Sequence, residues 1–554
     1  MNFVTRKSHI AGIDSRTFLF SLIILATNLA VRGWFNIHTA MSRDEPYTLY
    51  FAQLPIRQLL PIVLESNNPP SFEVLLHFWS QLVGNSERAL RWLPTLIISL
   101  GAIPFSLIGK RIGGYPAVWF SSILFLGSSA LMNFSHLDRA YCLLITGAIF
   151  QIYFLIKLHE SASWKYSAGW IVSTILICYS HYFGWCLPVM HWFILVSMPT
   201  SRAQMMRRMI APTLVALLFT SPLLLNLITQ LGAAANENAL KLSTPKALNV
   251  FHLGTEFLNS RYALSMILIA GGAWSVFNLK GPTKMSRVAT LLLCLALLTV
   301  SILPEEKQKN EFGILLFVLL SVSMFACLME IKRNKGTISE KIVLYCGLLP
   351  IACFFVLSSR FPVFIDRYLS FALPPLLLLV VILFSQLLRQ WIRYAFAASF
   401  LILFMVGFRF SPQYNVDNRE AIELFKRYHS KAEIGIIGPG YHDLDFAYYF
   451  NRSIFYNGAA HMRDTSGIKL IDDPGFVRHK EGLRRELLKN RIIVSHDSTD
   501  LNIQYATSVV YYDGNTSLSY PTNGIYDYLR ERFGEPAESA SFGSIYNVYL
   551  FEKK

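Results

Sequence analysis

Charged residues are scarce in this chain. Lys, Arg, Asp and Glu make up 15% of its 554 residues, against roughly 25% in ordinary soluble domains, whereas hydrophobic residues make up 53%. Long apolar runs recur from near residue 17 to near residue 409, and a helix needs ~20 apolar residues to span a bilayer. The composition excludes a purely soluble enzyme and predicts a polytopic α-helical membrane protein.

Cysteine pairs and clusters are also absent. The seven cysteines all fall in apolar segments, without a CxxC pair or a Cys/His cluster. This distribution argues against a disulfide framework and against a structural zinc site. The part of the chain after residue 411 has no P-loop, GxGxxG motif or nucleophile elbow, and no internal repeat or low-complexity linker is visible. The cysteines are Cys142, Cys178, Cys186, Cys294, Cys327, Cys346 and Cys353.

Negative charge is outnumbered by positive charge in the apolar part. From residue 412 onward there are 17 Lys and Arg against 19 Asp and Glu, a net charge of −2, so the total of +15 leaves +17 for residues 1–411. A nucleic-acid partner needs a basic soluble face, which the tail lacks. The positive residues gather instead in alternate connections, such as Lys110/Arg111 and Arg207/Arg208, and the positive-inside rule makes these connections cytoplasmic.

Thirteen spans fit the apolar runs, with an uncertainty of about one. This odd count places the N-terminus in the cytoplasm and both residues 42–50 and the tail on the external face. Short loops and an external tail favour a bacterial inner (plasma) membrane with a periplasmic tail. The spans are expected near 17–36, 89–108, 115–133, 141–157, 166–181, 183–199, 209–230, 261–278, 286–303, 312–331, 342–358, 368–387 and 392–409.

The loop 37–88 after the first span needs its own interpretation. Residues 68–84 are short for a span, and Glu73 and His77 interrupt them. Counting them as a span would also invert the charge pattern, so we expect an amphipathic helix lying on the external membrane surface. A second such helix is expected over 47–64.

The tail is expected to form a second domain. Residues 1–411 would be the transmembrane domain, and residues 412–554 a soluble, extracytoplasmic α/β domain. Strands are predicted at 432–440, 491–496 and 546–553, and helices at 418–429 and 526–534.

The external ends of the spans carry charges that topology does not explain. Charges beside spans are costly and usually functional. A carboxylate among them could deprotonate an acceptor hydroxyl, and the cations could neutralise a departing phosphate, which suits sugar transfer from a polyprenyl-phosphate donor. These external residues are Arg43, Asp44, Glu45, Arg57, His136, Asp138, Arg139, His181, Lys241, Lys246, Arg360, Asp366 and Arg367.

Several motifs, in this order, resemble a known family. They are RDEPYTLYFAQ (43–53), NNPPSFEVLLHFW (67–79), NSERALRWLPTL (85–96), LDRAYCLL (137–144), SHYFG (180–184) and DRYLSFALPP (366–375). Together they resemble the GT-C class of polyprenyl-phosphate-sugar-dependent glycosyltransferases, and within it glycosyltransferase family 39, the protein O-mannosyltransferase and ArnT-like aminoarabinose transferase family. Thirteen spans with an external C-terminal domain are also similar to the aminoarabinose transferase arrangement.

The resemblance implies roles for particular residues. Asp44 would be the catalytic carboxylate, and Glu45 would assist it or hold a divalent metal cation where the family uses one. Arg139 and Arg367 would contact the donor phosphate. Relatives often have His or Lys where this chain has Asn68, and an amide can hydrogen-bond a phosphate but cannot neutralise it.

Structural interpretations remain open for the other candidates. Arg43 is interpreted as an ion-pair partner of Asp44 or Glu45, or as a substrate contact, and Arg57 as a substrate contact or a headgroup anchor. Asp138 and Arg139 would contact substrate or pair with each other. His181 and Tyr368 would line the site or support neighbouring helices. Arg88 and Arg91 are interpreted as ties between the surface helix and the second span.

The sequence therefore predicts a membrane glycosyltransferase. It would move a sugar from a polyprenyl-phosphate donor to a lipid, glycan or protein acceptor on the external face, with inversion at the anomeric carbon. Two alternatives are a lipid-linked sugar flippase or transporter, which predicts repeated halves and polar residues at mid-membrane depth, and a non-catalytic envelope scaffold.

Overall fold

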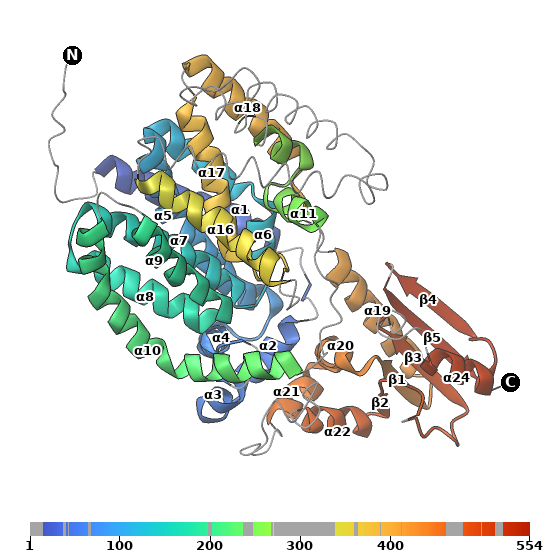
Figure 1. Ribbon diagram of the computed structural model, residues 1–554. Helices are drawn as coiled ribbons and strands as arrows, with labels where there is room; N and C mark the ends of the chain where they lie inside the picture. The colour runs from blue at the N-terminus through green and yellow to red at the C-terminus, as the bar shows by residue number, and fades with distance from the viewer. Residues whose placement is uncertain are drawn as a thin grey trace, which may run out of the picture.

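The chain folds into a helical part and a smaller part built on a β-sheet (Figure 1). Two of the expected spans, 286–303 and 312–331, lie outside the residues that the structure describes. The computed structural model describes residues 15–36, 40–41, 44–64, 68–197, 202–236, 247–267, 270, 338–358, 364–387, 389–410, 413–460, 480–499, 501–515, 524–543 and 545–553.

Long apolar helices make up most of the helical part. Five of the described helices are long and apolar enough to cross a membrane, and shorter apolar helices accompany them. An integral membrane protein is therefore confirmed, while the count of about thirteen spans stays a prediction. The helices of this part are α1 (Ser15–Asn36), α5 (Glu87–Leu126), α6 (Ser129–Phe134), α7 (Tyr141–Glu160), α8 (Trp164–Ser180), α9 (Cys186–Ser197), α10 (Arg202–Asn236), α11 (Ala247–Phe257), α16 (Ile338–Leu357), α17 (Leu373–Gln386) and α18 (Gln390–Val406).

The second and third expected spans differ in detail from the prediction. They form one continuous element, α5, which is bent where Gly113 and Gly114 leave helical geometry. Gly114 has φ +73°, which an L side chain rarely adopts. The predicted segment 115–133 is wrong at its C-terminal end, because the helix stops at Leu126. A separate helix, α6, follows, and Ser128 caps it by accepting a hydrogen bond from Leu131 N at 3.3 Å.

The loop after α1 carries three short helices. The single helix predicted over 47–64 is two helices, α2 (Glu45–Ala52) and α3 (Ile56–Leu64), which Pro55 separates. The predicted surface helix 68–84 is α4 (Ser71–Val83). This helix exposes Leu75, Phe78 and Leu82 while burying Glu73 and His77. Such an inverted pattern fits a helix whose outer face meets lipid and whose polar face turns toward the protein.

The tail contains a five-stranded sheet in the order β2-β1-β3-β5-β4. The first three strands in this order are parallel, and the pairs β3–β5 and β5–β4 are antiparallel. The predicted strands correspond to β1 (Ile434–Gly438), β2 (Ile492–Val494) and β5 (Tyr546–Glu552), whereas β3 (Ser508–Asp513) and β4 (Glu538–Phe542) were not predicted. The helices are α19 (Gln413–His429), α20 (Asp443–Phe450), α21 (Arg452–Ala460), α22 (Glu481–Lys489) and α24 (Gly524–Phe533).

Both faces of this sheet are covered. Val510 and Tyr512 belong to the core that includes α19, whereas Val509 and Tyr511 pack with α24. Because side chains alternate between the faces of a strand, a strand buried on both faces shows no alternation of polar and apolar residues. An α/β tail is therefore borne out by the described residues.

Candidate functional site

Charged residues from five separate segments meet on the face of the helical part that also contacts the tail. We call the five the charged cluster: Asp44 precedes α2, Glu73 lies in the first turn of α4, Arg139 precedes α7, His181 caps the C-terminal end of α8, and Arg367 precedes η2 (Ser370–Ala372). Four of these residues were predicted as site residues, and Glu73 was not.

An ion pair joins the two segments of the charged cluster that are farthest apart in the sequence. Arg367 Nη1 lies 3.1 Å from Asp44 Oδ2, and the two side chains are 43% and 50% exposed. This exposure leaves both groups accessible to a substrate. An exposed pair of this kind stabilises a fold only weakly, so its stabilising role is minor.

Arg139 lies beside this ion pair. Its Nη1 donates to Thr48 Oγ1 at 2.9 Å and to the main-chain oxygen of Asp44 at 3.2 Å. The guanidinium also lies 6.0 Å from the ring centre of Tyr47. Both hydrogen-bond acceptors are uncharged, so much of the positive charge of Arg139 remains available to an anion.

His181 supplies a neutral donor next to the two arginines. Burial lowers the pKa of His181 to about 3, and the positive charges of Arg139 and Arg367 lower it as well. Nδ1 accepts a hydrogen bond from Phe183 N at 3.2 Å, so in the neutral ring the hydrogen is assigned to Nε2. This Nε2 is buried and has no partner among the described residues. It is therefore suited to donate to a ligand oxygen.

Tyr368 forms the aromatic wall of the same site. Its ring centre lies 5.3 Å from that of His181 and 5.1 Å from that of Phe183, and the guanidinium of Arg367 lies 5.6 Å from it. These contacts give Arg367 and His181 a common support.

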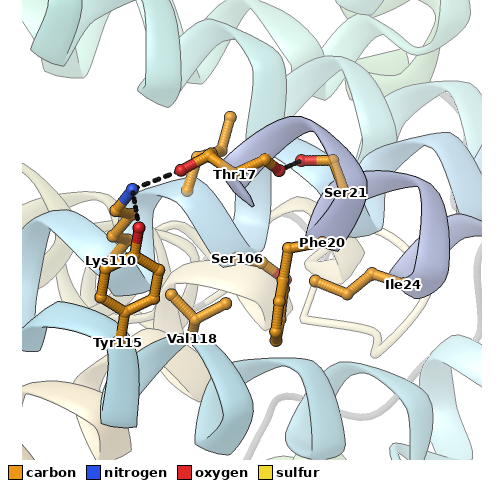
Figure 2. Close-up of a pocket in the computed structure, with 9 residues that line it drawn as sticks. Thr17, Phe20, Ser21, Ile24, Ser106, Lys110, Tyr115 and Val118 are labelled. Atoms are coloured by element: carbon orange, nitrogen blue, oxygen red, sulfur yellow. Dashed lines mark hydrogen bonds between the residues drawn. The ribbon is translucent and has the colours of Figure 1, made fainter. Parts of the chain in front are cut away.

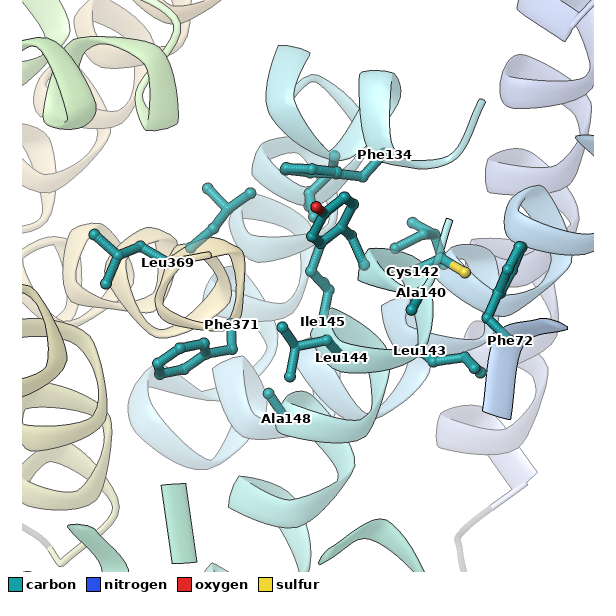
Figure 3. Close-up of a cluster of buried hydrophobic side chains, with 14 of the residues drawn as sticks. Phe72, Phe134, Ala140, Cys142, Leu143, Leu144, Ile145, Ala148, Leu369 and Phe371 are labelled. Carbon is teal, nitrogen blue, oxygen red and sulfur yellow. The ribbon is translucent and has the colours of Figure 1, made fainter. Parts of the chain in front are cut away.

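A buried apolar platform holds these segments together (Figure 3). Phe72 of α4 packs on one side of the first turns of α7, and Leu369 and Phe371 lie on the other. Three residues of this platform are direct neighbours in sequence of site residues. Phe72 precedes Glu73, Ala140 follows Arg139, and Leu369 follows Tyr368. Groups on elements packed in this way are held with the precision that catalysis requires.

Glu45 points away from the charged cluster. It is fully buried, pairs with Arg91 Nη2 at 3.1 Å, and accepts a hydrogen bond from Asp138 N at 2.9 Å. Arg91 also donates to the main-chain oxygen of Ala40. Arg91 therefore ties α2 and the preceding loop to α5, rather than the surface helix α4 that was predicted as its partner. These contacts place Glu45, predicted as a second catalytic residue, in a structural ion pair.

Asp138 does not pair with Arg139 and does not open to the site. Its side chain is buried beside Glu45 and Arg91, and neither carboxylate oxygen has a hydrogen-bond partner in the described part of the chain. Burial and the neighbouring Glu45 carboxylate raise the pKa of Asp138 well above its ordinary value. Its burial beside Glu45 and Arg91, away from the exposed ion pair of Asp44 and Arg367, corrects its interpretation as a substrate contact.

The remaining candidates are less informative. Arg57 is an exposed side chain on α3, and no interaction joins it to the charged cluster among the residues that the structure describes. Asn68 is half-buried just before α4. His136 is buried, and its Nε2 contacts the main-chain oxygen of Arg32 at 2.7 Å, which makes it a structural residue. Arg43, Lys241, Lys246 and Arg360 lie outside the described residues.

A metal site is not evident in the described structure. Within the described ranges, no three His, Cys, Asp or Glu side chains lie close enough together to hold a metal ion. Glu45, the predicted second ligand, is engaged with Arg91. The described residues do not fit a cation site at Asp44, and a divalent metal there stays only what the family resemblance implies.

Glu73 is the site residue that sequence reasoning missed. Its side chain is 4% exposed, and its Oε2 has no partner in the described structure. The available signal was a carboxylate within the apolar stretch SFEVLLHFW, which we had interpreted only as evidence against a membrane span.

A small pocket lies elsewhere, between α1 and α5 (Figure 2). It is lined by Phe20, Ile24, Val118 and other side chains, and Lys110 Nζ donates to Thr17 Oγ1 and, at 3.3 Å, to Tyr115 OH. Lys110 belongs to the connections predicted to be cytoplasmic. The pocket lies at the opposite end of α1 from the loop that carries Asp44, so it is separate from the charged cluster.

The tail docks on the loop that carries Asp44. Tyr449 OH of α20 accepts a hydrogen bond from Met41 N at 2.6 Å, and the ring of Phe455 lies 5.4 Å from that of Tyr50. Arg452 also pairs with Glu87 at 3.2 Å. These contacts confirm that residues 42–50 and the tail lie on the same side of the helical part.

Replacing Tyr449 by Phe tests this docking. The variant removes the acceptor of Met41 N and leaves the ring, so we expect a loss of about 0.5–1.5 kcal/mol in stability, measured by thermal unfolding in detergent. Tyr505→Phe is a control, because Tyr505 is almost fully exposed in the tail. Equal stability of both variants would show that the bond to Met41 contributes nothing.

Comparison with known proteins finds similarity only among solved structures; no family model and no curated protein matches the chain. ArnT from Cupriavidus metallidurans in the apo state is 14% identical, with a TM-score of 0.44 over 97% of this chain and 98% of that one. The same protein bound to undecaprenyl phosphate is 15% identical, with a TM-score of 0.38 over 97% of both chains.

An archaeal protein is also similar. The oligosaccharyltransferase AglB from Archaeoglobus fulgidus, in complex with an inhibitory peptide and a dolichol-phosphate, is 11% identical, with a TM-score of 0.45 over 93% of this chain and 71% of that one. Because the identities are at most 15% and the TM-scores are below 0.5, we base the functional interpretation on the residues of the charged cluster. The chain is thus similar, over nearly its whole length, to ArnT, a member of the family that its motifs resemble.

Proposed function

We propose that the chain is a membrane glycosyltransferase of the GT-C class. It transfers a sugar from a polyprenyl-phosphate donor to a hydroxyl or phosphate of a lipid, glycan or protein acceptor. The reaction takes place on the extracytoplasmic face, in our proposal that of a bacterial inner membrane. The observation that carries the proposal is the exposed Asp44 carboxylate, which pairs with Arg367, while Arg139 donates to the main-chain oxygen of Asp44 and the His181 N–H donor beside them has no partner in the described structure.

The charged cluster offers the groups that this reaction needs. An acceptor oxygen attacks the anomeric carbon and forms a new C–O bond, while the bond from that carbon to the phosphate oxygen breaks. Asp44 takes the proton from an acceptor hydroxyl. Arg139, Arg367 and the His181 N–H stabilise the negative charge on the departing polyprenyl phosphate. Attack from the face opposite the phosphate inverts the anomeric configuration.

We assign Arg139 to the donor phosphate, and Arg139→Gln tests this. Hydrogen bonds to charged groups contribute about 1.5–3 kcal/mol, so we expect kcat/KM for the donor to fall by roughly 10–150-fold. The assay supplies radiolabelled polyprenyl-phosphate sugars to the purified full chain in nanodiscs, with membranes from cells that lack the protein as the source of acceptor. Release of polyprenyl phosphate and labelling of an acceptor are measured.

Arg111→Gln is the matched control, since Arg111 pairs with Glu160 among the connections predicted to be cytoplasmic. Its kcat/KM is expected to stay within about twofold of the wild type. A wild-type protein that moves the donor across vesicle membranes without forming product would contradict the transferase and support the flippase.

A further inference from the structure

Glu73 has no role in the reaction as described above, although its surroundings are unusual. A buried carboxylate normally gains a hydrogen-bonded or charged partner, because burying an unpaired charge is costly. Glu73 is 4% exposed, yet Oε2 has no partner among the described residues. Such a group needs either a proton or a ligand.

The groups around Glu73 determine whether its carboxylate carries a proton. Burial raises the pKa of Glu73 to about 7, while the charge of Arg139 and the backbone N–H of Glu73 itself oppose this rise. Arg139 and Tyr47 are coupled to it electrostatically. Burial raises the pKa of Tyr47, so that phenol stays neutral. Arg139 therefore supplies positive charge that favours the ionised Glu73 carboxylate.

The elements packed against α4, which are α2, α3, α5 and α8, carry further titratable groups. α8 contributes His181 at its end, where Ser180 Oγ lies 3.3 Å from Ser71 Oγ at the start of α4, and His181 is neutral because its pKa is about 3. The remaining charged or titratable groups of these elements are Glu45 and Tyr50 of α2, Arg57 of α3, Glu87, Arg88, Arg91, Lys110, Arg111 and Tyr115 of α5, Lys165, Tyr166, Cys178 and Tyr179 of α8, and His77 of α4 itself.

Resting on the proposed function, we propose that Glu73 takes up a proton when the donor phosphate binds, so that the charge of Arg139 passes from Glu73 to the phosphate. The proton comes from bulk water and forms an O–H bond on Glu73, and no other bond changes. The Glu73 carboxylate and the phosphate would otherwise both draw on the Arg139 guanidinium, which Asp44 also approaches. Glu73 is in this sense a positioning residue that acts through Arg139.

The sign of the pH dependence follows from this coupling. Below about pH 7 Glu73 already carries its proton, and the donor binds without further cost. Above this value binding requires proton uptake, so the Kd of the donor rises with pH by up to ~10-fold per pH unit until the pKa of the bound state is reached. The substitution Glu73→Gln leaves a neutral side chain of the same shape, which we expect to mimic the protonated form and to bind the donor tightly across the range.

The probe must not titrate in the same range. Polyprenyl phosphate itself is a phosphate monoester, and such groups have a second pKa near ~6. We therefore choose a polyprenyl-phosphate sugar, a phosphodiester whose charge stays constant, and measure its Kd from about pH 5.5 to pH 8.5 for the full chain in nanodiscs. Glu160→Gln is the matched control, because Glu160 pairs with Lys157 at the far end of α7.

Wild type and Glu160→Gln are expected to lose affinity above about pH 7, whereas Glu73→Gln is expected to hold a constant Kd. Calorimetry of the wild type in two buffers of different ionisation enthalpy gives the same answer without a variant, since about one proton should enter per donor bound at pH 7–8. A constant wild-type Kd, or a pH dependence that survives in Glu73→Gln, would overturn the assignment of Glu73. Failure of the donor to bind at any pH would instead remove the proposed function.

Discussion

Replacing Asp44 by Asn lowers kcat by an expected ~10²–10⁴-fold, because a general base contributes about this much to a proton transfer. Asn keeps the shape of the side chain and a hydrogen-bond acceptor but cannot take the proton of an acceptor hydroxyl. The KM of the donor should change little, since Arg139 and His181 remain in place. Initial rates with the polyprenyl-phosphate sugar at varied donor concentration separate the two constants.

Asp527→Asn is the control for this substitution, because Asp527 is an exposed residue in the first turn of α24. The conservative variant Asp44→Glu keeps a carboxylate and is expected to retain more activity than Asp44→Asn. Unchanged kcat in Asp44→Asn would exclude Asp44 as the base. An equal loss in both Asp44 variants, with normal donor binding, would indicate that Asp44 only orients Arg367.

Replacing Arg91 by Met produces the largest expected loss of stability. Arg91 and Glu45 form an ion pair in which both side chains are 1% exposed, and removing one partner of a buried pair costs about 3–5 kcal/mol because the other charge remains buried. We expect a markedly lower midpoint of thermal unfolding in detergent and a smaller fraction of folded protein after purification.

The double variant Glu45→Gln/Arg91→Met separates this effect from lost packing. It removes both charges, and Gln can still accept the hydrogen bond from Asp138 N, so much of the lost stability should return. A double variant as unstable as Arg91→Met would show that the contact of Arg91 with Ala40, rather than the charge pair, dominates. Normal stability of the single variant would contradict the structural role of Glu45.

The membrane helices and several site residues were predictable from the sequence because their signals are local. An apolar run of bilayer length needs no knowledge of the rest of the fold, and Asp44, Arg139 and Arg367 stand out as charges beside such runs. The strands β1, β2 and β5 were also visible as apolar or aromatic runs. The short edge strand β4, with the sequence ESASF, is polar and carries no such signal.

The assignments that failed depend on three-dimensional partners. Asp44 and Glu45 are adjacent, yet one is exposed and the other fully buried, because α2 starts between them and turns Glu45 toward Arg91. No local pattern distinguishes the two carboxylates. Glu73 was missed for the same reason, since its burial on the polar face of an inverted amphipathic helix becomes visible only when α4 is packed.

The ion pair between Asp44 and Arg367 joins residues that are 323 positions apart. At a synthesis rate of about 5–20 residues per second, the carboxylate is made roughly 16–65 s before its guanidinium partner. Asp44, Glu73, Arg139 and His181 therefore enter the membrane well before the site can be completed, and the tail that holds Met41 is made last. A chain that stops before Arg367 lacks the partner of Asp44, so we expect it to be inactive in the proposed sugar transfer.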